Sequence, residues 1–249
     1  KIMILEFASV IGTLHENFGL PNQDCAVTFQ SEDWYGAVVC DGVSLNSKHE
    51  FSNSEIASAW CAAFIKDYLP ERLKDLDDGQ VLPLLGETFE ECDAGLKAWL
   101  FAMGIPYYDC QTTVLCMLLH EGSLYTALAG DGGVIYMCAD GSVGLMITKE
   151  KVSASVSPIC HPDGWRFMKY TEPGNPVIKA LAATDGIFDQ IFANQDGRRY
   201  INARKVSELF GLDQIDPARR KNWLENQAAS IESHDDRTLA LIIDDSKRE

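Results

Sequence analysis

The sequence predicts an α+β fold in which two antiparallel β-sheets pack on each other and helices lie outside them. Segments expected as strands fall before and after two long helical segments, whereas a doubly wound parallel sheet alternates strand and helix along the chain. Short Gly-containing turns separate the later strands, and such turns join antiparallel neighbours. Hydrophobic residues make up 46% of the 249 residues, which is enough for a large core.

The N-terminal part is expected to contribute three strands. Residues 2–10 alternate loosely between apolar and polar side chains, and residues 25–30 are short and rich in β-forming residues. Residues 34–40 form an apolar run that ends at Asp41-Gly42. Residues 11–24 carry glycine, proline and asparagine, so we expect a loop there.

Two helices are expected next. Apolar side chains recur at helical spacing in residues 53–69, and Ser52 or Asn53 is a suitable N-cap. Residues 82–101 place their apolar side chains on one face, and residues 75–79 connect the two helices. Each helix therefore has one side suited to covering a sheet.

Strands return after the helices. Residues 113–120, 124–129, 134–138 and 143–148 are separated by short turns, which predicts an antiparallel meander. Residues 153–176 are polar and rich in proline and glycine, and we interpret them as a long surface excursion near the functional site.

The C-terminal part mixes short helices with two strands. A strand at residues 177–184 runs into Asp185-Gly186, and a closing strand is expected at residues 238–243. Helices are expected at residues 187–192, 205–210 and 217–230, the last with proline near its start, where helices tolerate it.

Charge and cysteine usage exclude several classes of protein. The formal net charge is −16, which disfavours general binding to nucleic acid or to an anionic membrane. No apolar run reaches the ~18 residues of a membrane span, and the opening residues lack a secretory signal. The eight cysteines are scattered without a Cys-x-x-Cys pair, which indicates buried reduced thiols and a cytoplasmic location.

Three carboxylates stand at the ends of probable core strands. Asp41 and Asp185 follow apolar strands and precede glycine, and Asp235 comes just before the closing strand. Mg²⁺ and Mn²⁺ prefer oxygen ligands, and paired ions can activate a water for phosphoryl displacement. Asp-Gly is also common turn chemistry, as at Asp140-Gly141, so the residues alone leave a metal site and ordinary turns both open.

Six sequence elements occur in an order known from one family. They are Gly12-Thr13-Leu14-His15 with Asn22-Gln23-Asp24, then Val39-Cys40-Asp41-Gly42, Gln111-Thr112-Thr113, Gly130-Asp131-Gly132-Gly133, Ala183-Thr184-Asp185-Gly186-Ile187-Phe188-Asp189 and Asp235-Asp236-Arg237-Thr238. Over nearly its whole length the chain thereby resembles the protein phosphatase 2C family, in its compact bacterial branch.

The resemblance implies a single domain over residues 1–249, built as a four-layer αββα sandwich. It implies hydrolysis of phosphoserine or phosphothreonine in a protein substrate by a water that two Mn²⁺ or Mg²⁺ ions activate. Asp41 would bridge both ions, the Gly42 carbonyl would bind one, and Asp185 and Asp235 would bind the other. Asp24 would hydrogen-bond to water that is itself bound to a metal ion. Asp109 lies near the position at which the family carries an Asp that holds a third ion.

The chain departs from the family pattern at several positions. His15 stands where the family has a phosphate-binding Arg, so His15 either contacts phosphate or satisfies local backbone. Val43 replaces a His that serves some members as general acid, and Gln23 replaces an acidic residue beside Asp24. His161, Arg166 and Lys169 are candidates for steering phosphate, or they lie on a solvated loop.

Three functions are therefore weighed. The leading one is an active two-metal phosphatase acting on phosphoproteins, and small phosphoesters remain open as substrates because the phosphate anchor is not fixed. The second is a metal-binding but catalytically weak or silent interaction domain. The third, a two-metal nuclease or phosphodiesterase, is disfavoured by the acidic charge.

Overall fold

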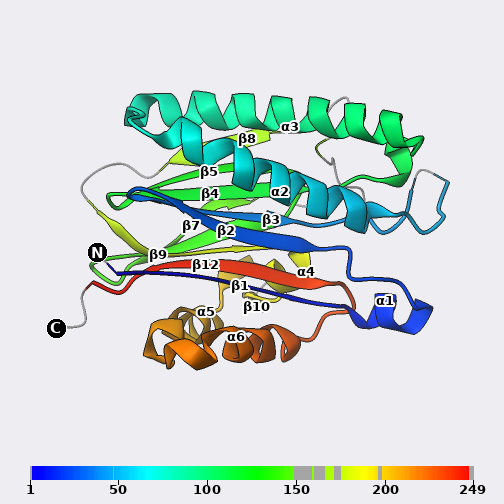
Figure 1. Ribbon diagram of the computed structural model, residues 1–249. Coiled ribbons are helices and arrows are strands. Elements are labelled where there is room, and N and C mark those ends of the chain that lie inside the picture. Colours follow the sequence, from blue (N-terminus) through cyan, green and yellow to red (C-terminus); the bar gives the residue numbers. More distant parts are fainter. Residues whose placement is uncertain are drawn as a thin grey trace.

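The computed structural model describes residues 2–46, 48–148, 159, 166–170, 175–195 and 198–246, with backbone alone at 147–148, 166–170, 193–195 and 198–199. Within these residues, ten strands form two five-stranded sheets whose neighbouring strands are all antiparallel. The two sheets lie face to face, with helices on both outer sides (Figure 1). The predicted αββα sandwich is confirmed.

Each sheet combines strands from distant parts of the chain. In spatial order, the first sheet contains β2 (Cys25–Ser31), β3 (Trp34–Cys40), β4 (Val114–His120), β5 (Ser123–Ala129) and β8 (Arg166–Tyr170). The second contains β1 (Met3–Val10), β12 (Arg237–Asp244), β9 (Val177–Ala183), β6 (Gly133–Cys138) and β7 (Val143–Thr148). Because β1 pairs with β12, the two ends of the chain are joined in one sheet.

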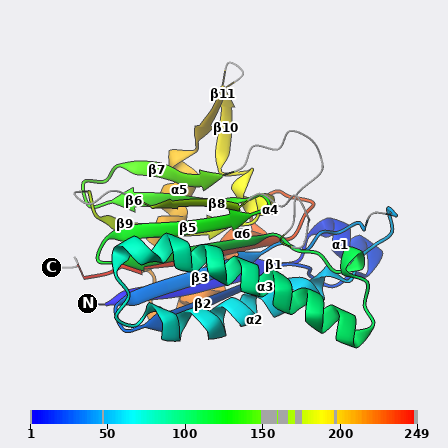
Figure 2. The ribbon, with the colours of Figure 1, turned by 90° about the horizontal axis from the view of Figure 1, so that it is seen from above.

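The helices form the two outer layers. The long helices α2 (Ser54–Leu73) and α3 (Val81–Met103) cover the first sheet, and α5 (Ala203–Phe210) and α6 (Arg220–Ala229) cover the second (Figures 1 and 2). Short 3-10 helices span Asp78–Gln80, Tyr107–Asp109, Gly211–Gln214 and Pro217–Arg219. Two short α-helices, α1 (Thr13–Phe18) and α4 (Asp185–Phe188), lie near strand ends.

Alternate side chains of each central strand face different core layers. On β3, Val38 and Cys40 pack into the core shared with α2 and α3, whereas Ala37 and Val39 pack into the core between the sheets. Strand β12 divides its side chains in the same way between the inter-sheet core and the core beneath α5 and α6. Both faces of these strands are buried, and this accounts for their apolar runs, Trp34–Cys40 in β3 and Leu239–Ile243 in β12.

The predicted four-stranded meander is wrong. Strands β4 and β5 pair in the first sheet, but β6 and β7 pair in the second, and no register joins β5 to β6. The chain crosses between the sheets at Gly130–Gly132, where Gly130 and Gly132 have φ values of 111° and 94°. This short glycine turn is therefore a crossing between the sheets and not a hairpin turn. Glycine suits it because only glycine adopts such φ angles readily.

Two other predictions missed short elements. The predicted loop at residues 11–24 contains α1, which ends at Gly19 in a left-handed conformation with φ 65°. Most of the predicted excursion at residues 153–176 lies outside the described residues, but its described part contains β8, which pairs with β5. Neither element is long enough to show a clear period, and each depends on partners that are distant in sequence.

The predicted helix at residues 187–192 is also shorter than expected. Helix α4 begins at Asp185 itself and ends at Phe188. The next residues form a separate hairpin of β10 (Phe192–Gln195) and β11 (Arg198–Ile201), which projects from the sandwich in Figure 2. Because this hairpin belongs to neither large sheet, no regular burial pattern marks it in the sequence.

Helix α2 continues past a proline where we expected it to end. Pro70 lies inside the helix, and the buried Leu69 and Leu73 on either side pack into the core. The burial of Leu73 outweighs the hydrogen bond lost at Pro70. The Pro70 carbonyl accepts a hydrogen bond from the Ser31 hydroxyl at 2.6 Å, which ties this turn of the helix to β2.

The seven described cysteines are thiols, and six of them are buried, as predicted; Cys160 lies outside the described residues. In the described part of the chain, no helix is long and apolar enough to cross a membrane.

Candidate active site

Three carboxylates meet where strands of both sheets end. Asp41 follows β3, Asp131 lies in the crossing from β5 to β6, and Asp185 begins α4 directly after β9 and Thr184. Carboxylate oxygens of the three residues all lie within 4.8 Å of one another. The structure therefore brings together two of the predicted ligands, Asp41 and Asp185, and adds Asp131.

Backbone packing fixes this convergence. A Cβ on Gly132 would lie 2.6 Å from the Ala183 carbonyl oxygen, so glycine is needed for the crossing to pass this close to β9. The Asp41 carbonyl accepts hydrogen bonds from the Thr113 N–H at 2.8 Å and the Thr112 hydroxyl at 2.9 Å. The ends of β3, β4 and β9 are thus held in one rigid arrangement beneath the carboxylates.

Asp24 and Asp235 lie beside this cluster. Asp24 is 9% exposed and accepts a hydrogen bond from the Thr184 hydroxyl at 2.9 Å. Asp235 accepts a hydrogen bond from the Asp236 N–H at 3.1 Å. Glycine at position 186 lets α4 approach the Asp235–Asp236 backbone, because a Cβ there would collide with the Asp236 carbonyl.

The carboxylates disfavour one another's charge. Burial raises the pKa of Asp41 well above its usual range, and the carboxylates of Asp24, Asp185, Asp235 and Asp131 raise it further. Burial likewise raises the pKa of Asp24, and the Asp236 carboxylate raises it further. Burial and then the Asp185 carboxylate raise the pKa of Asp235. A cation among these oxygens would offset the repulsion.

Gly42 lies at the base of the cluster. It forms an isolated antiparallel bridge with Thr112, and a Cβ at this position would lie 2.6 Å from the Gln23 carbonyl oxygen. The following residue, Val43, donates its N–H to the Gln111 carbonyl at 2.9 Å. The loop after β3 is therefore anchored to the segment that precedes β4.

His15 lies inside the protein rather than on an exposed loop. The side chain belongs to α1 and is 1% exposed. Its Nδ1 lies 2.8 Å from Asp236 Oδ2, and its Nε2 lies 3.1 Å from Ser44 Oγ. Asp236 also accepts the N–H groups of Gly12 and Gln23, both at 2.6 Å. His15 thus joins α1 to the Asp235–Asp236 segment and to the loop after β3.

A cavity of about 820 Å³ opens beside the carboxylates. Its lining includes Asp185, Asp235, Gln190, Ser233 and His234. Of the three clustered carboxylates, Asp185 lines this cavity.

A model of one protein family matches most of the chain. The description of that family is protein phosphatase 2C, and the match covers residues 11–226. The chain belongs to the protein phosphatase 2C family. This membership confirms the predicted family and the enzyme class that it implies, a protein phosphatase.

Solved structures share the phosphatase 2C fold of this chain. A bacterial serine phosphatase matches with a TM-score of 0.67 and 16% identity over 100% of both chains. The serine/threonine phosphatase Stp1 from Staphylococcus aureus gives 0.62 and 16%, covering 98% of this chain and 95% of that one. RsbX in complex with magnesium gives 0.57 and 13%, covering 97% and 94%. No curated protein matches the sequence.

Asp131 belongs to the carboxylate cluster but is not among the ligands predicted from the sequence. It lies in the family's Gly-Asp element and is 7% exposed. The available signal was its position between two glycines after an apolar strand, the same context that singled out Asp41 and Asp185. The sequence predicts a hairpin at this glycine turn, and a hairpin turn gives Asp131 no site role.

Asp109, the candidate near a third-metal position, contacts protein groups instead. Its Oδ1 accepts a hydrogen bond from Asn46 Nδ2 and its Oδ2 from Asn53 Nδ2, both at 2.9 Å. These bonds hold the segment between β3 and α2.

Three cationic residues lie on strands that end near the site, Arg237 on β12 and Arg166 and Lys169 on β8. Arg237 is 8% exposed and donates hydrogen bonds to the carbonyls of Ala229, Ile231 and Ile11, so it fixes backbone. Arg166 and Lys169 lie on β8, where the Arg166 backbone pairs with Ala129, close to the crossing that carries Asp131. His161 lies outside the described residues.

Proposed function

We propose that this phosphatase 2C protein hydrolyses phosphoserine and phosphothreonine in protein substrates with the help of Mn²⁺ or Mg²⁺. The observation that supports this most directly is the meeting of Asp41, Asp131 and Asp185 within 4.8 Å, at strand ends that come from both sheets. The serine/threonine phosphatase Stp1 shares the fold, which is consistent with the same reaction type.

The residues present suit hard divalent cations. The cluster offers oxygen ligands only, and the neighbouring carboxylates raise the pKa of Asp41, so a cation would relieve an existing repulsion. We propose that Asp41 and the Gly42 carbonyl hold one ion, and that Asp41, Asp185 and Asp235 hold a second. Asp131 would add a further oxygen ligand. Such ions supply a nucleophilic water and neutralise charge on the phosphate.

The remaining residues have positioning roles in this proposal. Asp24 accepts a hydrogen bond from Thr184, directly before Asp185, and its carboxylate would orient water beside the ligands. The 820 Å³ cavity beside Asp185 and Asp235 would receive the phosphorylated side chain. The packed strand ends beneath the cluster would keep the ligands fixed as phosphate arrives.

One observation favours a second candidate function. Both ring nitrogens of His15 face Asp236 and Ser44, so the position where the family carries a phosphate-binding Arg offers an internal contact instead. The second candidate is a metal-binding interaction domain with weak or no turnover.

The experiment that separates the two is hydrolysis of p-nitrophenyl phosphate and of a phosphothreonine peptide. We expect turnover that requires Mn²⁺ or Mg²⁺ and stops when a chelator is added. Metal binding without turnover on either substrate would instead support the interaction domain. Turnover that persists in chelator would contradict the role of the metal.

A second prediction concerns stability. Folded Asp41, Asp24 and Asp235 have raised pKa values, so the folded state binds more protons than the unfolded state above the usual Asp range. The metal-free protein should therefore lose stability as pH rises through that interval. Because bound metal requires deprotonated carboxylates, excess Mn²⁺ should raise the melting temperature by about 5–10 °C near pH 7.5, and by less near pH 5.

Thermal melts at both pH values, with and without Mn²⁺, check this prediction. Ca²⁺ and Mg²⁺ titrations serve as comparisons for the ion preference of the site. A melting temperature unchanged by any divalent ion would contradict a metal site in this cluster.

We also infer that residues 1–249 form one domain, since the family match spans most of the chain and β1 pairs with β12 across its two ends. The cytoplasmic location and the lack of nucleic-acid and membrane partners stay predictions from the sequence.

A further inference from the structure

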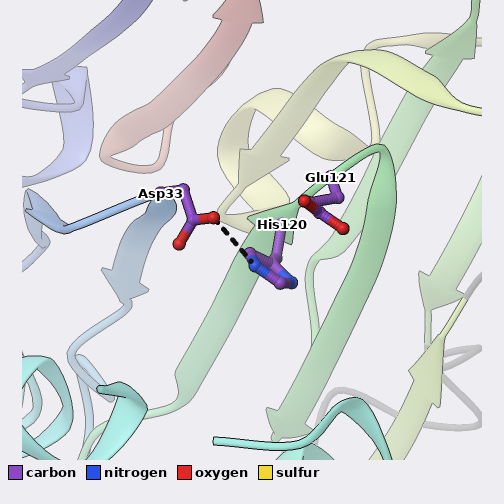
Figure 3. Close-up of side chains that lie close together, drawn as sticks. All are labelled: Asp33, His120 and Glu121. Carbon is purple, nitrogen blue, oxygen red and sulfur yellow. Dashed lines mark ion pairs between the residues drawn. The ribbon is translucent and has the colours of Figure 1, made fainter. Parts of the chain in front are cut away.

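A second cluster of metal-ligating side chains lies at the end of the first sheet opposite the active site. Asp33 lies in the turn between β2 and β3, His120 ends β4, and Glu121 lies in the turn between β4 and β5. Single oxygen or nitrogen atoms of the three side chains lie within 4.8 Å of one another. Figure 3 shows the carboxylates of Asp33 and Glu121 on either side of the His120 ring.

The backbone fixes the positions of these residues. Trp34 and His120 are directly paired across β3 and β4, and His120 pairs with Ser123 at the two-residue turn of the β4–β5 hairpin. Glu121 and Gly122 in that turn have φ values of 47° and 86°, as a tight hairpin requires. The cluster is therefore built on sheet ends rather than on a long loop.

The His120 ring is also fixed in orientation. It stacks on Trp34, which is 2% exposed, with the ring centroids 4.0 Å apart and an interplanar angle of 9°. On its other edge, Nδ1 forms a hydrogen bond with Asp78 Oδ1 at 3.3 Å. Nε2 faces Asp33, so the tautomer with its proton on Nδ1 would donate to Asp78 and leave the Nε2 lone pair for an ion, the usual arrangement around a metal-binding histidine.

The distance between His120 and Asp33 suits a shared cation. Nε2 lies 3.3 Å from Asp33 Oδ2, the same length as the contact between Nδ1 and Asp78 Oδ1. Two ligands each about 2.1 Å from one ion, at angles between octahedral and tetrahedral, lie about 3.0–3.4 Å apart. Both carboxylates are on exposed turns, so a hydrated ion can reach them.

A neighbouring pocket adds negative charge. Asp33 and Glu121 also line a pocket of about 350 Å³ together with Asp244, and the rest of its lining among the described residues is Gly122, Pro176, Val177 and Ile178. Three carboxylates and no basic side chain face this hollow in the described part of the chain, which favours a cation over an anion.

We propose that Asp33, His120 and Glu121 bind a borderline transition-metal ion such as Zn²⁺, at a site separate from the phosphatase centre. Imidazole with carboxylates suits Zn²⁺, Ni²⁺ or Co²⁺, whereas Mg²⁺ prefers oxygen ligands alone. Asp33 and Asp41 flank the two ends of β3, so about 25 Å separate the two sites. The ion joins the β2–β3 and β4–β5 turns, and Asp78 connects them to the segment between α2 and α3.

The test is isothermal titration of Zn²⁺ into the full chain in excess Mg²⁺. The wild type is compared with the Asp33→Asn/Glu121→Gln double variant and with a control, Asp67→Asn/Glu90→Gln, that removes two exposed carboxylates from α2 and α3. We expect the double variant to bind one fewer Zn²⁺ per chain, with at least about 100-fold weaker affinity at this site, and the control to match the wild type. Asp78→Asn should weaken the same site by about tenfold.

A second measurement locates the ion without relying on these variants. Ni²⁺ bound at His120 quenches the fluorescence of the stacked Trp34, so part of the quenching should disappear in Trp34→Phe. Equal Zn²⁺ stoichiometry and affinity in the wild type and the Asp33/Glu121 variant would overturn the proposal. So would quenching that is unchanged in Trp34→Phe, which would leave His120 as an ion-pair partner of Asp33 and Asp78 only.

Discussion

Asp185→Asn is expected to lower kcat/KM for p-nitrophenyl phosphate by about 10³-fold or more in excess Mn²⁺. The carboxylate of Asp185 lies within 4.8 Å of those of Asp41 and Asp131, and Asn removes its charge with almost no change in shape. Loss of a preorganised electrostatic group at a reacting centre costs about 10²–10³-fold, and loss of ion affinity adds to this.

Stability should change in the opposite direction. The Asp185 carboxylate raises the pKa of both Asp41 and Asp235, so Asn at this position relieves repulsion in the metal-free protein. We therefore expect the metal-free variant to melt at or above the wild-type temperature while its activity collapses. A residue needed only for folding would lower both quantities.

Asp67→Asn is the matched control for this experiment. Asp67 is an exposed carboxylate on α2 that belongs neither to the cavity lining nor to the cluster of Asp41, Asp131 and Asp185. Its activity should stay within about twofold of the wild type. An Asp185→Asn enzyme with near wild-type turnover would mean that the cluster is not the catalytic centre. Asp131→Asn, measured alongside, tests whether Asp131 is also a ligand, a role that the sequence did not predict.

The strands that could be predicted are those whose side chains face two cores. Residues 34–40, and residues 177–183 except Lys179, are apolar because Val38 and Leu181 face helices while Val39 and Ala182 face the opposite sheet. Burial on both faces leaves an apolar run that sequence alone reveals. Asp41 and Asp185 were found for the same reason, since each ends such a run.

What could not be predicted depends on pairing between distant segments. The crossing at Gly130–Gly132 and an ordinary hairpin turn have the same sequence signal, and only the pairing of β6 with β9 distinguishes them. Helix α1 is six residues long, shorter than any helix that is stable alone, and it is held by the contacts of His15. The local sequence does not show that β6 pairs with β9 or that His15 contacts Asp236.

His15→Ala is expected to destabilise the protein by about 3 kcal/mol, measured by urea unfolding. The side chains of His15 and Asp236 are both 1% exposed, and removing one partner of a buried pair costs about 3–5 kcal/mol. In the variant, Asp236 still accepts hydrogen bonds from the N–H groups of Gly12 and Gln23, so we expect a loss of stability at the low end of this range. His234→Ala, an exposed histidine on the same side of the protein, should change stability by less than about 0.5 kcal/mol.

The same variant distinguishes the structure from the sequence-based hypothesis for His15. If His15 anchors phosphate in place of the family's Arg, His15→Ala raises KM and leaves the free energy of unfolding unchanged. If it joins α1 to Asp236, the free energy of unfolding falls, KM changes little, and a double-mutant cycle with Asp236→Ala gives a coupling energy of about 1–3 kcal/mol. The contacts at 2.8 Å to Asp236 and 3.1 Å to Ser44 favour the second result, since they occupy both ring nitrogens inside the protein.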